Sequence, residues 1–245
     1  GAVGAGGLLS PELEACRNGD VPAVLALLEE GWSVHTADRF GGPALHWAAS
    51  SGSLPLCQLL VARSADVAKS DKKSGRSAVH WAARHGHVEV LLWLLNAPHL
   101  QPPDVPTKDG TTPLHLGAWG GHVRVCELLE RQGANAHALN RWECGAAHFA
   151  ALAGELATCA WLHARGVCLG VRNAQGHNAL HKAAYGGHRE LCAWLQHGPP
   201  HLDAECALTD ARGQTAVELA RKAGFVELAQ ELAQRRQTAP SRQVG

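Results

Sequence analysis

The 245-residue sequence has no methionine, one tyrosine and three phenylalanines, and its 22 basic residues balance its 22 acidic ones. A chain without net charge is not expected to coat nucleic acid, since such binding depends on an excess of Lys and Arg. No apolar run approaches the ~18–20 residues of a membrane-spanning helix, so we expect no membrane insertion. Without a methionine the chain has no initiator, and we expect the printed sequence to begin downstream of one.

Signatures of catalysis are also missing from the sequence. There is no Gly-x-Ser-x-Gly, no phosphate-cradling glycine loop and no His-Glu-x-x-His. The eight cysteines form no Cys-x-x-Cys, and no Cys/His spacing matches a zinc finger. We therefore predict a protein that is not an enzyme and has no catalytic residues, cofactor or metal. The alternative is a zinc site around Cys168, His197, His201 and Cys206, although their spacing matches no established ligand pattern.

Repetition is the dominant feature of the sequence. The stretch Thr112-Pro-Leu-His115 is the clearest copy of a pattern whose histidine recurs at intervals of 34, 35, 33 and 33 residues. The same position, here called the histidine position, holds His46, His80, His115, His148 and His181, with Leu13 and Glu218 in two outer copies. A glycine follows six residues later in all seven copies, at Gly19, Gly52, Gly86, Gly121, Gly154, Gly187 and Gly224.

The residues of this pattern have mechanical roles at the two ends of a helix. Thr112 is suited to cap a helix N-terminus, and Pro113 to occupy the first helical position, where a missing N–H costs nothing. Gly121 is suited to the left-handed conformation that ends a helix. Each copy thus predicts a first helix, a glycine turn and an apolar second helix. The second helices expected in three copies are 88–95, 189–196 and 226–233.

Four of the cysteines follow the same period. Cys57, Cys126, Cys159 and Cys192 lie eleven residues after the histidine position, which in two other copies is occupied by Val24 and Leu91. This position is therefore expected to lie in the core of the second helix, where Cys acts as a small hydrophobic residue. Free core thiols fit a reducing compartment, so we predict a cytoplasmic or nuclear protein.

The Thr-Pro-Leu-His stretch, the glycine row and the 33-residue interval together resemble the ankyrin repeat. The resemblance implies an all-α ankyrin-repeat solenoid of about seven helix-turn-helix units with short hairpin loops. We predict a domain spanning 8–237, with repeats near 8–37, 38–71, 72–106, 107–139, 140–172, 173–209 and 210–237. The flanking segments 1–7 and 238–245 are expected to be disordered.

The resemblance also implies a binding face. In ankyrin repeats, the loop before the first helix and the residues just before the glycine line a concave surface that contacts a partner. These positions are rich in Lys, Arg and aromatic residues here, with Asp109 as the one acid. The predicted partner-binding residues are Phe40, Arg76, Arg84, Trp119, Arg141, Trp142 and Tyr185.

These residues favour a non-catalytic protein–protein interaction scaffold, because Arg and aromatic side chains dominate binding hot spots. The basic character of the face predicts a protein partner that presents an acidic peptide or domain surface. The alternative is RNA or nucleotide binding by the same face, through bases stacked among arginines. Nucleic acid is the less expected partner because the chain has no net positive charge.

Overall fold

The fold is described from a computed structural model, which covers residues 9–96, 98–200, 202 and 208–238. Within these residues the chain forms fourteen α-helices and no strand, with one isolated antiparallel bridge between Ala37 and Pro43. Of the segments expected to be disordered, 1–7 and 239–245 lie outside the described residues, whereas Thr238 is helical. The fold class is an all-α repeat solenoid, as the sequence pattern predicts.

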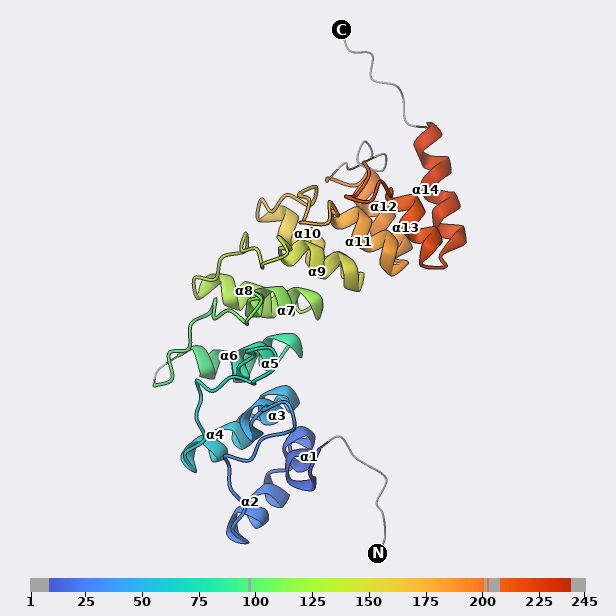
Figure 1. The fold of residues 1–245 in the computed structure, drawn as a ribbon. Helices are drawn as coiled ribbons and strands as arrows, with labels where there is room; N and C mark the ends of the chain where they lie inside the picture. Colours follow the sequence, from blue (N-terminus) through green and yellow to red (C-terminus); the bar gives the residue numbers. More distant parts are fainter. Residues whose placement is uncertain (1–8, 97, 201, 203–207, 239–245) are drawn as a thin grey trace, which may run out of the picture. The chain divides into compact units, whose positions relative to one another are not determined.

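The fourteen helices form seven pairs, each joined by a short glycine turn (Figure 1). The first helices are α1 Pro11–Asn18, α3 Ala44–Ser51, α5 Ala78–Arg84, α7 Pro113–Trp119, α9 Ala146–Ala153, α11 Ala179–Gly186 and α13 Ala216–Lys222. The second helices are α2 Val21–Glu29, α4 Leu54–Ala62, α6 Val88–Leu95, α8 Val123–Arg131, α10 Leu156–Ala164, α12 Arg189–His197 and α14 Val226–Thr238. Helix α14 continues to Thr238, whereas the sequence predicted an end near residue 233.

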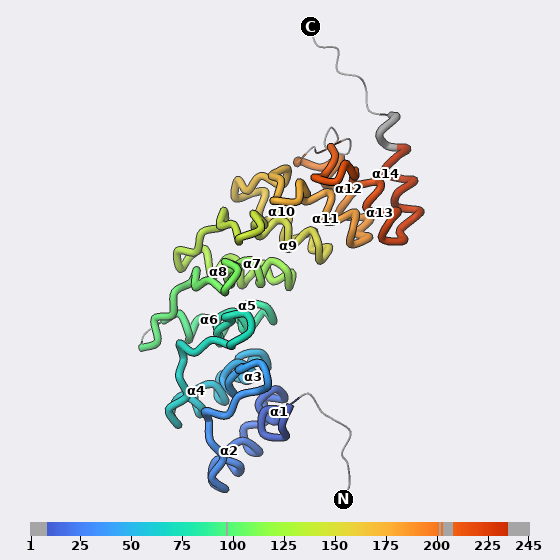
Figure 2. The backbone as a smooth tube through the Cα atoms, in the orientation of Figure 1, coloured from blue at the N-terminus to red at the C-terminus, as the bar shows by residue number. Residues whose placement is uncertain are grey.

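The helices divide into two compact units. The N-terminal unit takes in Gly1–Pro113 and Arg124–Ala134, and the C-terminal unit takes in Leu114–Val123 and Asn135–Gly245. In the N-terminal unit, α3 packs against α1 on one side and α5 on the other. In the C-terminal unit, α11 lies between α9 and α13 in the same manner (Figure 2).

Small residues let the first helices approach closely. In four of the repeats the two positions that follow the histidine by two and three residues hold paired alanines. Of these, Ala48, Ala49, Ala183 and Ala184 are fully buried. The second helices contribute larger residues to the core, such as Leu91. Cys57, Cys126, Cys159 and Cys192 are fully buried too, which confirms that their shared position belongs to the core.

The repeated histidines are part of this framework. The backbone N–H of Gly145 donates to Nδ1 of His148 over 3.1 Å, and Nε2–H of His148 donates to the carbonyl of His177 over 3.0 Å. His80 makes the same pair of bonds, with the N–H of Ser77 and the carbonyl of Thr111. Each of these two histidines ties the start of its own helix to the loop of the next repeat, so its buried polar atoms are satisfied.

The seven glycines that follow the histidine position all have positive φ, between 70° and 93°. This left-handed conformation ends the first helix and turns the chain toward the second. The sequence therefore located every one of these turns correctly.

Candidate partner-binding surface

Two of the loops that precede first helices, those with Phe40 and Trp142, are each built around one acceptor side chain. Oδ1 of Asp38 accepts from the N–H of Phe40 over 2.7 Å and from that of Gly42 over 2.9 Å. Oδ1 of Asn140 accepts in the same way from the N–H of Trp142 and of Cys144, over 3.0 Å in both cases. The side chain that follows the acceptor by two residues is therefore held at a fixed place on each loop.

Backbone hydrogen bonds join successive loops within each unit. The N–H of Lys72 donates to the carbonyl of Phe40 over 3.1 Å in the N-terminal unit. In the C-terminal unit the N–H of Ala174 donates to the carbonyl of Trp142 over 3.0 Å. The exposed aromatic side chains Phe40 and Trp142 thus stand on loops that are fixed to their neighbours.

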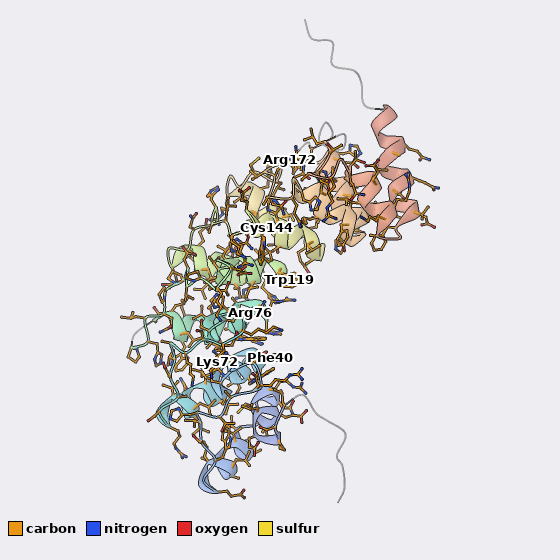
Figure 3. All side chains as sticks on the ribbon, viewed as in Figure 1. Phe40, Lys72, Arg76, Trp119, Cys144 and Arg172 are labelled. Carbon is orange, nitrogen blue, oxygen red and sulfur yellow. The ribbon has the colours of Figure 1, made fainter. Side chains whose placement is uncertain are left out.

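Aromatic rings and cations alternate on the loop side of the N-terminal unit. The ring of Phe40, which is 42% exposed, has the guanidinium of Arg39 and the ammonium of Lys73 each 4.6 Å from its centroid. The guanidinium of Arg76 lies 5.7 Å from the ring centroid of Trp81. Figure 3 shows Phe40, Lys72 and Arg76 close together in this unit. Such cation–π contacts hold the cations over apolar surface without removing their charge.

A cavity of about 230 Å³ opens between these residues. Its floor includes the indoles of Trp47 and Trp81, whose centroids are 5.8 Å apart. Asp71 also lines it, but the carboxylate of Asp71 accepts from the N–H of Ser74 and of Arg76. Burial acts to raise the pKa of Asp71, yet these hydrogen bonds hold that pKa below its ordinary value. We call Phe40, Lys73, Arg76, Trp47 and Trp81 the aromatic patch.

The C-terminal unit presents a second aromatic residue on a loop. The ring of Trp142 is 45% exposed, and the guanidinium of Arg141 lies 4.6 Å from its centroid. Trp119 is half-buried at the end of α7, with its ring centroid 6.1 Å from that of Phe149. Trp119 therefore packs within the unit and offers a partner only part of its ring.

The C-terminal unit also has a cavity of about 600 Å³, which is lined by residues of α9, α11 and α13 and of the loops that precede α11 and α13. Its wall carries Lys182 and Tyr185 from α11, Lys222 from α13, and Arg212 from the preceding loop. Burial lowers the pKa of Lys182 from its ordinary value. We call this cavity the basic pocket.

The basic pocket contains one carboxylate, which is already engaged. Oδ2 of Asp210 accepts from Nε2–H of His177 over 2.9 Å, and Oδ1 accepts from the N–H of Arg212 and of Gln214 over 2.8 Å. Burial lowers the pKa of His177, although Asp210 acts to raise it. The imidazole is therefore neutral at pH 7, and the carboxylate is held by these donors.

The seven residues predicted from the sequence fall into two groups. Phe40, Arg76 and Arg84 belong to the N-terminal unit, where Arg84 is half-buried at the end of α5. Trp119, Arg141, Trp142 and Tyr185 belong to the C-terminal unit. Each group lies within its own unit, and one concave face shared by all seven residues remains a prediction.

Several residues of these surfaces were not among the seven predicted ones, and three of them share one feature. Trp47, Trp81 and Lys182 occupy one repeated position, directly after the histidine. This position is half-buried at all three places, so its side chains take part both in packing and in the surface. The sequence contains a signal for Lys182, because the other four histidine-containing repeats and the last repeat hold Trp, Phe or Leu at this position.

The described ranges contain no cluster of three or more His, Cys, Asp or Glu side chains arranged to hold a metal ion. His201 and Cys206, two members of the alternative zinc site, lie outside those ranges. Across the same part of the chain, every helix is too short or too polar to span a membrane.

A family model described as ankyrin repeats (3 copies) matches this chain at residues 13–104, 68–140, 114–205 and 147–242. The matches together cover nearly all of the sequence. The chain belongs to the ankyrin-repeat family. Ankyrin repeats generally serve as protein–protein interaction modules and are generally non-catalytic.

Curated relatives are similar over parts of their length. The chain is 42% identical over 94 residues to the nuclear factor NF-kappa-B p105 subunit of Mus musculus, which covers 38% of this chain and 9% of that protein. It is 33% identical over 129 residues to the p105 subunit of Gallus gallus, covering 51% and 13%. It is also 30% identical over 158 residues to the probable E3 ubiquitin-protein ligase XBOS32 of Oryza sativa subsp. japonica, covering 53% and 32%. The chain thus spans about a tenth of the p105 subunits and about a third of XBOS32.

Proposed function

We propose that this chain is a non-catalytic scaffold that binds an acidic peptide or domain surface of a partner protein. The contact residues would be Phe40, Arg76, Arg84, Trp119, Arg141, Trp142 and Tyr185, joined by Trp47, Trp81 and Lys182. The fold provides the fixed loops, and the side chains on them provide the recognition.

One observation carries the proposal: several loop cations stack on aromatic rings instead of pairing with acids. Among the described residues, Arg39, Lys73, Arg76 and Arg141 form no ion pair with a carboxylate. Acids are paired elsewhere in that part of the chain, as Arg17 pairs with Glu14 and Arg189 with Glu227. Such cations beside exposed rings suit a partner that brings carboxylates and apolar side chains together.

The test is affinity purification with the full chain, followed by mass spectrometry of the bound proteins. One variant combines Phe40→Ala with Arg76→Glu, and a second combines Trp142→Ala with Arg141→Glu. We expect at least one of them to lose the main partners, because each removes an apolar anchor and reverses a charge. Arg131→Glu on the exposed end of α8 is the matched control for charge reversal. Retention of every partner by both variants would refute this placement of the binding surface.

A second candidate function is binding of RNA or a nucleotide. The exposed indole of Trp142 with the adjacent guanidinium of Arg141 favours it, because a base can stack on such a ring beside a cation. A labelled single-stranded oligonucleotide tests this at a low salt concentration of about 50 mM, where phosphate contacts are strongest. No binding under that condition would remove this candidate.

A further inference from the structure

We infer that the basic pocket of the C-terminal unit receives a carboxylate side chain from an acidic segment of the partner protein, with an apolar side chain of the same segment beside it. The inference rests on the proposed function, because it names the chemistry that one part of the surface recognises. It concerns Lys182, Tyr185, Lys222 and Arg212, whose positions belong to a single compact unit.

The first argument is charge. Three of the residues that line the pocket are basic: Lys182, Arg212 and Lys222. None of them forms an ion pair among the described residues of the chain. The carboxylate of Asp210 is engaged by His177 and two backbone N–H groups. The pocket therefore has an excess of positive charge inside a partly enclosed space, where electrostatic attraction is stronger than on an open surface.

The second argument is the position of Lys182. Its place directly after the histidine is held by Phe149 in the repeat before and by Leu219 in the repeat after. A half-buried ammonium flanked by repeats that hold apolar side chains at this position loses part of its hydration, and a carboxylate from a partner can replace it. The lowered pKa of Lys182 reports that loss of hydration. A carboxylate in the pocket would restore the missing interaction.

The third argument is the apolar wall. Leu152, Tyr185 and Lys222 occupy equivalent positions in three consecutive repeats, two residues before the glycine. Leu152 and Leu219 line the pocket beside the cations. An acidic residue with an apolar neighbour would pair with the cations and also pack against the leucines. A free inorganic anion would pair with the cations alone.

The shape favours a protein segment over nucleic acid. The cations gather around one pocket of about 600 Å³, whereas a nucleic-acid strand is followed by a groove of cations along several phosphates. A single carboxylate with its neighbouring side chain is the smaller group that such a pocket admits.

The test begins with selection of phage-displayed random dodecapeptides on the whole 245-residue chain. We expect the enriched peptides to carry Asp or Glu next to Leu, Ile or Phe. The strongest one, synthesised with a fluorescent label, is then titrated with the chain and its variants by anisotropy. Lys182→Met and Lys222→Met should each weaken binding by about tenfold or more, and Lys182→Arg should retain most of it because the charge is kept. Arg221→Met, one residue from Lys222 but outside the pocket lining, is the matched control and should change nothing.

The outcomes separate this inference from the proposed function. If acidic peptides bind and are lost with Phe40→Ala or Trp142→Ala but not with Lys182→Met, the scaffold function stands and the pocket inference is wrong. Enrichment of peptides that lack Asp and Glu would overturn the pocket inference as well. If labelled polyuridylate binds and is lost with Lys182→Met while no peptide is enriched, both proposals fail and the pocket serves nucleic acid. Folding of each variant is checked by circular dichroism, and Lys222→Met keeps the test decisive if Lys182→Met unfolds.

Discussion

The imidazole of His188 lies directly over Gly154 of the preceding repeat. A Cβ atom on Gly154 would be 2.4 Å from Nδ1 of His188, and Nε2–H of His188 donates to the carbonyl of Leu152 over 2.9 Å. The N-terminal unit repeats this relationship, with His87 over Gly52 and a 2.8 Å bond to the carbonyl of Ser50. The histidine after one glycine thus closes the glycine turn of the repeat before it.

Replacing Gly154 with alanine should destabilise the C-terminal unit by more than backbone strain alone. The residue has φ +83°, and the new methyl group would collide with His188 and break its bond to Leu152. We expect a loss of about 2–4 kcal/mol, from a strained conformation of about 1–2 kcal/mol and a lost, partly buried hydrogen bond of about 1–2 kcal/mol. Urea denaturation followed by circular dichroism measures the change.

Gly166→Ala is the matched control. Gly166 has φ +79°, but no other part of the described chain comes within 4 Å of the place where the methyl carbon would lie. Alanine there therefore adds strain without a collision, and it should cost about 1–2 kcal/mol. Equal losses at the two sites would show that His188 can move away freely.

Acidification should destabilise the protein well before its carboxylates titrate. Burial lowers the pKa of His80, His148 and His181 to about 4 from the ordinary value of 6.5. Between pH 6.5 and 4 these histidines are protonated in the unfolded chain but remain neutral in the folded chain. The stability that the neutral histidines contribute is therefore fully present above pH 6.5. It is lost as the pH falls toward 4, by about 1.4 kcal/mol per pH unit for each histidine. Urea midpoints at pH 7, 6 and 5 test this.

The matched pair for the pH dependence is His148→Gln and His35→Gln. His148→Gln removes one of the histidines whose pKa is lowered by burial, so the loss of stability between pH 6.5 and 5 should become shallower, by up to about 1.4 kcal/mol per pH unit. His35 is exposed, and its replacement should leave the slope unchanged. An identical slope in both variants would contradict the burial argument.

Asn178 should reveal how much a helix cap contributes to one repeat. Its Oδ1 accepts from the backbone N–H of His181 over 3.0 Å at the start of α11, and the residue is fully buried. Asn178→Ala should cost about 1–2 kcal/mol. Asn178→Gly should cost only a few tenths of a kcal/mol. Gly145 occupies the equivalent cap position before α9. Thermal unfolding of both variants provides the comparison, and an alanine variant as stable as the glycine variant would show that the cap is redundant.

Alkylation should distinguish surface thiols from framework thiols. Burial raises the pKa of Cys57, Cys126 and Cys159 to about 12, so almost no thiolate is present at pH 8. Cys168 is exposed and should react first with iodoacetamide, which mass spectrometry of the native protein would detect. The three buried thiols should react only after urea is added. Rapid native labelling of Cys126 would mean that α8 opens readily.

The framework was predictable from the sequence because it repeats. A histidine, a glycine or a cysteine that returns at a constant interval reports a constant environment, and His148, Gly154 and Cys159 lie where that interval places them. The end of α14 was not predictable in this way. No following repeat marks its boundary, and its polar residues are compatible with either helix or tail.

The surface was only partly predictable, for a different reason. Phe40 and Trp142 follow a loop acceptor by two residues, and their exposure could be inferred from that position. Whether Trp47 lines a cavity depends on Phe40 and Lys73 of adjacent loops, which only the packed structure brings together. Trp119 illustrates the reverse case, because Phe149 from the next repeat covers part of a ring that sequence position alone would leave open.

The position directly after the histidine holds a different kind of side chain in different repeats. It holds an indole in the second and third repeats and an ammonium in the sixth, while the backbone around it stays the same. The effect of a change of chemistry there is confined to the adjacent repeats, because each repeat contacts only those beside it. The binding preference of such a chain can consequently diversify one residue at a time, with the scaffold left intact.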